Sequence, residues 1–396
     1  MNSDANRSSS SGLVPLIALM IVGLSGAVVT TVMPVVTAGF VAAYHISQPG
    51  AAWISSAELC GLTASTAIGS FLVGRFNWRL LSGVPLIICL ALDLMTTLTH
   101  AVPLLAALRL GAGFCEGMVV TVQAAGLGTS SNPVRNFSIF ITAMMAISAG
   151  FFVTMPLLVS LNPIVGPMCA LGLFAICSLI SVPFLPSRAA AAQSHSMTAK
   201  VQPVPLILGM LAILLFMIGV GLVWPLMSVI GLQLGILLKA SGPVFGEATI
   251  AALFAVLFGS WLHVRMGRVL PLIGSACAVL FSVLAIALHQ SGLFSLIVLV
   301  FLSGWMFSFP YYFGLVGSAD PIGRASAFSM SVQFLGLAVG PPVGAMLMGN
   351  GSSFDNAKLA AVLFVAACIL GIAGDRTLRQ AAVKASPSLN QRVTAP

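Results

Sequence analysis

The chain has 396 residues, of which 59% are hydrophobic and 6% are charged, and its mean hydropathy is +1.10. A soluble domain carries about 25% charged residues, so this composition excludes a soluble globular protein and predicts a membrane protein. The formal net charge of +8 would also fit a nucleic-acid partner, and the positions of the basic residues must decide between the two.

Continuous apolar segments follow one another along the chain, each close to the ~20 residues that a membrane-spanning helix needs. A closed β-barrel would instead show segments of about ten residues with alternating polarity, so we predict helices. Six segments lie on each side of residues 186–204. The twelve predicted spans are 13–35, 53–73, 80–98, 102–127, 137–158, 164–185, 205–230, 245–263, 269–288, 294–316, 326–348 and 359–373.

The ends and the middle of the chain are polar. The leader carries Arg7 and no clear small-residue cleavage site, which predicts that the first helix is retained. The tail is basic and ends in Ser/Pro-rich sequence, which predicts disorder. The predicted domains are a leader (1–12), an amino-terminal six-helix bundle (13–185), a linker (186–204), a carboxy-terminal six-helix bundle (205–373) and a tail (374–396).

Basic residues are distributed unevenly about these spans. With the amino terminus in the cytoplasm, Lys239 and Lys358 lie outside, Arg109 lies within a span, and the other Lys and Arg residues lie inside. This bias follows the positive-inside rule and places both termini and the linker in the cytoplasm. The basic excess therefore sets topology, and we expect a monomeric, multi-pass cell-membrane protein (inner membrane in a bacterium) with the lipid bilayer and a small-molecule substrate, not nucleic acid, as its partners.

Other function classes lack their sequence signatures. The seven Cys lie in or beside apolar runs with no Cys-x-x-Cys pair, so we interpret them as packing residues and expect no metal site. The chain has no Gly-x-Ser-x-Gly or His-Glu-x-x-His motif, which argues against an intramembrane enzyme. The absence of a Gly-x-x-x-x-Gly-Lys-Ser/Thr loop excludes a nucleotide-driven pump.

Two short stretches match each other at an offset of 190 residues. Gly69-Ser-Phe-Leu with Arg75 corresponds to Gly259-Ser-Trp-Leu with Arg265, and Gly150 corresponds to Gly340 at the same offset. The shared spacing predicts that the two bundles are structural repeats.

The loops that follow the second and eighth spans are basic turns. The second copy reads Gly259-Ser-Trp-Leu-His-Val-Arg265-Met-Gly267-Arg268, which resembles the Gly-x-x-x-Asp-Arg-x-Gly-Arg loop of the major facilitator superfamily. Span four, from Arg109 to Gly113, resembles that family's Arg-x-x-x-Gly signature, and Gly336 to Gly344 in span eleven is similar to an antiporter motif of span five. The resemblance implies an all-α membrane protein with two six-helix bundles related by pseudo-two-fold symmetry.

The same resemblance implies cytoplasmic gate loops, with two departures. The loop acid is replaced by Gly74 and Val264, which questions its charge latch, and span five has Gly150-Phe151 where antiporters have Gly-Pro. The predicted gate residues are Gly69, Arg75, Arg79, Gly259, Arg265, Gly267 and Arg268.

Four acids fall within predicted spans: Glu58, Asp93, Glu116 and Glu247. An ionised group at bilayer depth costs at least ~2.5 kcal/mol, so such residues usually face a cavity or a partner. Low dielectric favours the neutral carboxyl, which suits these side chains to carry a proton. We predict them as proton-coupling candidates, led by Glu116 and Glu58. The alternative is that they are protonated, interfacial or helix-capping groups.

Span four carries a polar stripe, because Arg109, Glu116 and Gln123 recur every seven residues, or about two helical turns. Spans one, four, seven and ten line the central cavity in the superfamily, so the resemblance places this stripe on the substrate path. The alternative is a structural ion pair of Arg109 with Glu116 or with Glu58.

Span ten, the repeat partner of span four, is aromatic instead of charged. Trp305, Phe309 and Tyr312 share one face, with Tyr311 beside them, and Trp224-Pro225 lies in span seven. Proline frees a helix carbonyl there, as Pro34 does in span one. An aromatic stripe is also typical of packing. The functional hypothesis is a cavity for a small amphipathic solute, for example a carboxylate that meets Arg109.

Taken together, these patterns predict a secondary active transporter that moves a small organic solute by alternating access, coupled to protons and without a cofactor. Sodium coupling would require a cluster of oxygen ligands that the sequence does not show. A drug or metabolite efflux antiporter of the same superfamily is the alternative, and a non-transporting membrane receptor on the same fold is a more remote one.

Overall fold

The computed structural model describes residues 13–128, 133–187, 201–320, 324–348 and 354–385. The predicted leader, the centre of the linker and the Ser/Pro-rich end of the tail lie outside these ranges. Bilayer-spanning backbone must satisfy its hydrogen bonds internally, and the apolar runs accordingly form helices.

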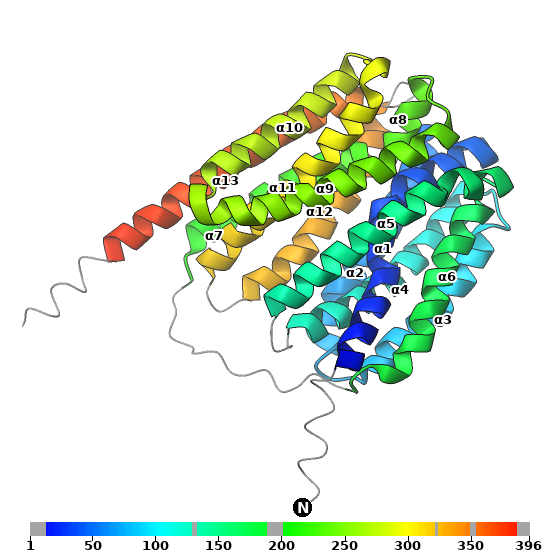
Figure 1. Ribbon diagram of the computed structural model, residues 1–396, viewed down its shortest axis with the longest axis horizontal. Helices are drawn as coiled ribbons and strands as arrows, with labels where there is room; N and C mark the ends of the chain where they lie inside the picture. The colour runs from blue at the N-terminus through cyan, green and yellow to red at the C-terminus, as the bar shows by residue number, and fades with distance from the viewer. Residues whose placement is uncertain (1–12, 129–132, 188–200, 321–323, 349–353, 386–396) are drawn as a thin grey trace, which may run out of the picture.

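The amino-terminal half forms one bundle (Figure 1). Its elements are α1 (Leu13–Tyr44), α2 (Gln48–Leu72), α3 (Trp78–Thr96), α4 (Val102–Gly128), α5 (Pro133–Leu161), α6 (Val165–Ser181) and the short 3-10 helix η1 (Val182–Phe184). Side chains fix some of the helix starts. The Ser47 hydroxyl accepts from the Gly50 amide at the start of α2, and the Asn77 side chain accepts from the Arg79 amide at the start of α3.

The carboxy-terminal half forms the second bundle. Its elements are α7 (Pro203–Val223), η2 (Trp224–Leu226), α8 (Met227–Gln233), α9 (Leu238–Met266), α10 (Val269–Ala287), η3 (Ser291–Leu293), α11 (Phe294–Ala319), α12 (Arg324–Met348) and α13 (Phe354–Ala385). Predicted span seven is thus broken into α7, η2 and α8 at Trp224-Pro225, where proline removes a backbone donor.

Every predicted span lies on a helix of the described chain, and ten helices are long and apolar enough to cross a membrane by length and composition. The predicted runs 53–73 and 137–158, on α2 and α5, fall outside those ten; α5 contributes the shorter apolar stretch Ile139–Thr154. Protein covers part of α2, which packs against α4 and α12, so its polar residues need not face lipid. The helix α13 also runs past the predicted boundary at 373, because hydropathy marks the apolar segment and not the helix end.

The two bundles repeat one packing scheme, as the 190-residue offset predicts. The contacts of α2 with α4, of α1 with α6 and of α3 with α4 recur as α9 with α11, α7 with α13 and α10 with α11. Gly69 packs against Thr121 of α4, and its sequence partner Gly259 packs against Phe307 of α11. The other sequence match is not reproduced in packing, because Gly340 lies against Gly221 of α7 whereas Gly150 has open space around it.

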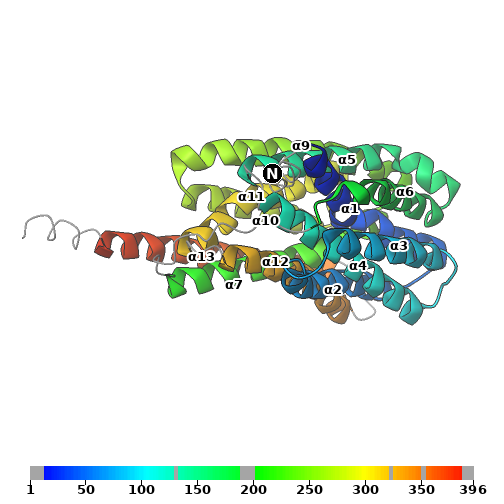
Figure 2. The same cartoon turned by 90° about the horizontal axis from the view of Figure 1, so that it is seen from below.

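Two pairs of helices make the most extensive contacts between the bundles. Figures 1 and 2 show α5 beside α9 and α2 beside α12, and both pairs are in contact.

We call the side of the molecule with Tyr44, Gln48 and Gln233 the distal face, and the side with Leu13 and Pro203 the proximal face. Residues 31–40 and 219–231, toward the distal face, are all buried, whereas exposed and buried residues are interspersed in the proximal parts of α1 and α7. The bundles therefore enclose α1 and the broken span most completely on the distal side.

Glycine allows α2 and α4 to cross closely. Gly113 and Gly117 are four residues apart on α4, the spacing that small residues use between membrane helices. A side chain at Gly113 would overlap the backbone carbonyl of Glu58, and one at Gly117 would meet Ser65 and Leu62. This close approach sets the depth at which Glu58 faces α4.

We expect Gly113→Ala to lower the unfolding free energy by about 1–3 kcal/mol, because the added methyl group meets rigid backbone. Thermal unfolding of the detergent-purified protein measures this change. Gly150→Ala is the matched control on α5, since a methyl group there meets no atom within 4 Å. Equal stability of Gly113→Ala and the wild type would contradict the close crossing.

Candidate functional site: a buried acid cluster and an aromatic junction

The guanidinium of Arg109 lies fully buried inside the amino-terminal bundle. Its Nη1 donates to Glu58 Oε1 of α2 at 3.0 Å, and its Nη2 donates to Asp93 Oδ1 of α3. One of the two predicted ion pairs, Arg109 with Glu58, is therefore present, and Asp93 is a second partner. Because both carboxylates belong to neighbouring helices, the cluster ties α2, α3 and α4 together.

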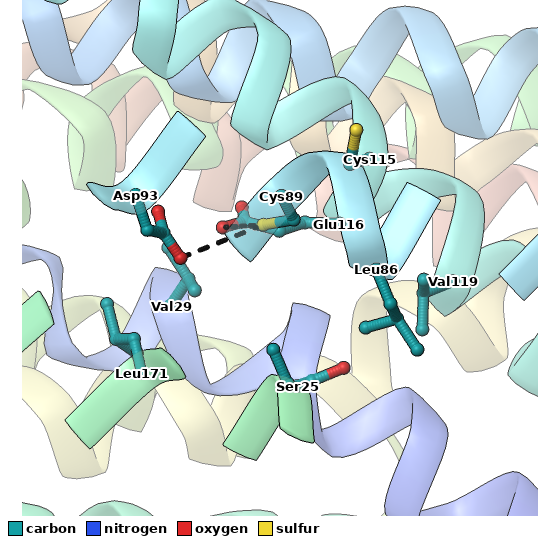
Figure 3. Close-up of a pocket in the computed structure, with 10 residues that line it drawn as sticks. Ser25, Val29, Leu86, Cys89, Asp93, Cys115, Glu116, Val119 and Leu171 are labelled. Carbon is teal, nitrogen blue, oxygen red and sulfur yellow. Dashed lines mark hydrogen bonds between the residues drawn. The ribbon is translucent and has the colours of Figure 1, made fainter. Parts of the chain in front are cut away.

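The third acid, Glu116, lies two turns from Arg109 on α4 and contacts a thiol instead. Cys89 Sγ of α3 lies 3.9 Å from Glu116 Oε1 and 3.9 Å from Asp93 Oδ2, so it stands between the two carboxyl groups, as Figure 3 shows. Glu116 Oε2 is buried and has no hydrogen-bond partner within the described chain. One cation therefore faces three carboxyl groups in a low-dielectric interior.

A small cavity adjoins this cluster, with room for about one water molecule. It lies between α1, α3, α4 and α6, hence within the amino-terminal bundle and not between the bundles (Figure 3). Polar atoms of Asp93, Glu116, Cys89 and Ser25 line it, and the remaining walls are apolar apart from Cys115. Among the described residues, no set of three or more His, Cys, Asp or Glu is arranged to hold a metal ion.

The other predicted polar residues lie apart from this cluster. Gln123, at the end of the predicted stripe, is buried and packs against Gly23 of α1. Glu247 is exposed on α9. It lies 12 residues before Gly259, whereas Glu58 lies 11 before Gly69, and a one-residue slip turns a side chain by about 100° around a helix. The repeat therefore does not place Glu247 where Glu58 lies.

Aromatic side chains gather where the broken span meets α1 and α11. The Trp224 indole donates from Nε1 to the Thr30 carbonyl of α1 at 3.0 Å, which links the two bundles. Its ring stacks on Phe301 with a centroid distance of 6.3 Å and meets Trp305 edge-on at 5.7 Å. Phe309 packs beside Trp305 at 6.4 Å. We call Trp224, Phe301, Trp305 and Phe309 the aromatic junction.

Both predicted tyrosines point into the carboxy-terminal bundle instead. The Tyr311 hydroxyl donates to the Gly259 carbonyl at 2.7 Å, and Tyr312 packs on Phe216 of α7 at 5.4 Å and against Gly371 of α13. The predicted stripe of span ten is therefore divided. Trp305 and Phe309 belong to the junction, while Tyr312 contributes to packing.

The basic turns contact the carboxy-terminal end of the amino-terminal bundle and the last helix of the carboxy-terminal bundle. Arg79 Nε donates to the Leu185 carbonyl at 2.9 Å in the amino-terminal half. In the carboxy-terminal half, Arg268 contacts Asp375 of α13 at 3.2 Å, and it also donates to Ser318 and to the Gly314 carbonyl of α11. Asp375 thus supplies an acid where the loop motif lacks one.

The remaining gate residues are only partly described. Gly267 ends α9 with φ 68°, a conformation that glycine adopts without strain. Arg75 is exposed. The side chain of Arg265 lies outside the described part, and the gate role of the turns stays a prediction.

Sequence reasoning missed Cys89 and the hydrogen bond from Ser56 of α2 to the Ala338 carbonyl of α12, 2.8 Å long. Cys89 carries no signal beyond its position four residues before Asp93, which places both on one helix face. The carbonyl of Ala338 does carry a signal, because Pro342 follows it by four residues.

Comparison with known proteins gives similarity in structure alone. No protein-family model and no curated protein sequence matches the chain. A D-xylose–proton symporter matches with a TM-score of 0.70 at 15% identity, over 91% of this chain and 96% of that one.

The xylose transporter XylE from E. coli, in a partially occluded inward open conformation, matches with a TM-score of 0.68 at 14% identity, over 91% of this chain and 96% of that one. The nucleoside transporter NupG matches with a TM-score of 0.65 at 13% identity, over 92% of this chain and 99% of that one. The fold of this multi-pass membrane protein is that of major facilitator superfamily transporters.

Proposed function

We propose that the protein is a secondary active transporter of the major facilitator superfamily that moves a small, uncharged organic solute by alternating access, coupled to protons. The observation that carries this proposal is the buried cluster of one guanidinium and three carboxyl groups on a fold made of two repeated bundles. Twelve spans and a distal face that lies outside the cell belong to the same proposal.

Charge balance supports Glu116 as the group that carries the proton. Glu58 and Asp93 share the Arg109 cation, and this trio already has one negative charge in excess when both acids are ionised. A further charge on Glu116, whose Oε1 has only a thiol contact within the described chain, would be strongly disfavoured at this depth. Glu116 therefore holds a proton in this arrangement, and the adjoining cavity gives that proton a place to exchange with water.

The arrangement around Arg109 bears on the solute. Both terminal nitrogens of Arg109 contact carboxylates of the protein, so we do not propose that this residue binds a carboxylate solute. The aromatic junction instead places packed rings at the meeting point of the bundles, and the indole Nε1 of Trp305 is buried without a hydrogen-bond partner in the described chain. A solute that has a flat or apolar face and a hydrogen-bond acceptor suits these side chains.

Sugars and nucleosides are therefore the first solutes to test, since the xylose symporter and the nucleoside transporter share the fold. A thermal-shift screen of the purified protein should find solutes that raise its unfolding temperature, and organic acids serve as the contrasting class. Counterflow of each hit in proteoliposomes should then show saturable exchange. Binding without flux would contradict transport and favour the receptor alternative.

The same proteoliposomes separate symport from efflux antiport. An imposed pH gradient should drive the solute in the direction of proton movement if the protein is a symporter, and against it if the protein is an antiporter. A solute distribution that ignores the pH gradient would contradict proton coupling.

A further inference from the structure

Among the described residues, hydrogen bonds from the side chains of Gln233, Ser56 and Trp224 cross between the bundles, and they lie from the middle of α1 toward the distal face. Gln233 donates to Gln48 at 2.9 Å at the surface. Deeper in, the Ser56 hydroxyl donates to the Ala338 carbonyl at 2.8 Å, and the Trp224 indole donates to the Thr30 carbonyl at 3.0 Å.

Both deeper acceptors are carbonyls that a proline has left without a helical partner. A helix carbonyl normally accepts from the amide four residues later. Thr30 is followed four residues later by Pro34, and Ala338 by Pro342, and neither proline has an amide hydrogen. A buried carbonyl without a partner is costly, so each proline creates a demand for a donor from elsewhere.

The bundles meet this demand reciprocally. The amino-terminal bundle supplies the Ser56 hydroxyl and the Thr30 carbonyl, and the carboxy-terminal bundle supplies the Trp224 indole and the Ala338 carbonyl. These bonds are therefore made across the interface and depend on the bundles staying together on the distal side. The complete burial of residues 31–40 and 219–231 shows where that closure lies.

We propose that Trp224 and Ser56 are positioning residues that hold the distal side of the transporter closed, by donating across the bundle interface to carbonyls freed by Pro34 and Pro342. This inference rests on the proposed function, since it assigns the bonds to one of the two states of alternating access. Opening of the distal side breaks both bonds and exposes both carbonyls to water.

Hydrogen–deuterium exchange of the full chain in lipid nanodiscs tests this role without a solute. Trp224→Phe keeps an aromatic ring but removes the donor, and Ser56→Ala removes the hydroxyl. Each should raise exchange in residues 31–40 and 227–233 by about fivefold, the effect of one net hydrogen bond. Exchange in residues 203–218 should fall, because the proximal side closes as the distal side opens. A general loss of stability would instead raise exchange on the distal and on the proximal side.

Matched variants isolate the bonds. Ser55→Ala is the control for Ser56→Ala, because the Ser55 hydroxyl contacts Thr37 and the Ala51 carbonyl within its own bundle. It should leave distal exchange unchanged. Ser56→Thr keeps the hydroxyl and should restore wild-type exchange.

Adjacent prolines provide the sharpest comparison. Pro342→Ala gives the Ala338 carbonyl its own helical amide, so adding Ser56→Ala should then change distal exchange by less than about twofold. Pro341 frees the Leu337 carbonyl, which lies against Gly221 of the same bundle. In a Pro341→Ala background, Ser56→Ala should keep its full effect.

The proposal is overturned if Trp224→Phe and Ser56→Ala exchange like the wild type, or if the effect of Ser56→Ala is the same in both proline backgrounds. Since no solute enters this measurement, a failure to find flux in proteoliposomes would overturn the proposed function while leaving the state-dependent bonds measurable.

Discussion

Arg109→Leu is expected to lower the unfolding free energy by about 3–5 kcal/mol, because it leaves the carboxyl groups of Glu58 and Asp93 buried without their cation. Arg109 is fully buried, so solvent offers no replacement partner. Thermal unfolding in detergent and the yield of monodisperse protein measure the loss. The unfolding free energy of Arg109→Lys should fall between those of Arg109→Leu and the wild type, since a point charge cannot make the same pair of contacts as a planar guanidinium.

Neutralising the ion-paired trio of Arg109, Glu58 and Asp93 separates folding from transport. The variant with Arg109→Met, Glu58→Gln and Asp93→Asn removes all three charges at similar volume and should recover most of the lost stability. If Arg109 acts in transport as well as in structure, this variant folds and does not accumulate solute. Wild-type transport by the folded, neutral variant would show that the trio is structural. Wild-type stability of Arg109→Leu would contradict the ion pairs themselves.

Glu116→Gln is expected to abolish accumulation of solute driven by a pH gradient and to leave counterflow exchange intact. The amide has the shape of the protonated carboxyl group and makes a similar contact with Cys89, but it cannot release a proton. Parallel measurements of pH-driven uptake and counterflow in the same proteoliposomes test this. Thermal stability should stay close to that of the wild type, because the native Glu116 is already neutral in our proposal.

The control is Glu247→Gln, which makes the same chemical change at an exposed position of α9 and should leave both activities unchanged. Accumulation that persists in Glu116→Gln would exclude this residue as the proton carrier and direct attention to Glu58. Loss of counterflow together with accumulation would indicate that Glu116 contributes to solute binding or to the movement of the bundles.

The fold followed from the sequence to a large extent, because hydropathy and repetition are strong signals in a membrane protein. Long apolar runs require helices, and the match between Gly69 and Gly259 reflects two equivalent helix crossings, against Thr121 and Phe307. The helix ends were less predictable. The helix α13 extends to Ala385 because a helix can continue beyond the membrane where hydropathy falls.

The site was predictable only where its residues share one helix. Arg109 and Glu116 are related by helical period, and their depth in a span pointed to a functional role. The partners of Arg109 depended on which faces of α2 and α3 turn toward α4, and periodicity within one helix does not determine this. Asp93 was thus recognised as a buried acid but not as an ion-pair partner of Arg109. Cys89 was interpreted as a packing residue because a thiol has no distinctive pattern.

The position of the acid cluster has a consequence for how such proteins diversify. Its charged groups come from α2, α3 and α4, and its cavity is completed by α1 and α6, so residues 13–187 contain the whole arrangement. All four residues of the aromatic junction belong to the other half. If the proposed roles hold, mutations in that half can accumulate under selection for a new cargo while the proposed proton-coupling cluster is inherited unchanged. Gene duplication followed by unequal divergence provides a route to this division of labour.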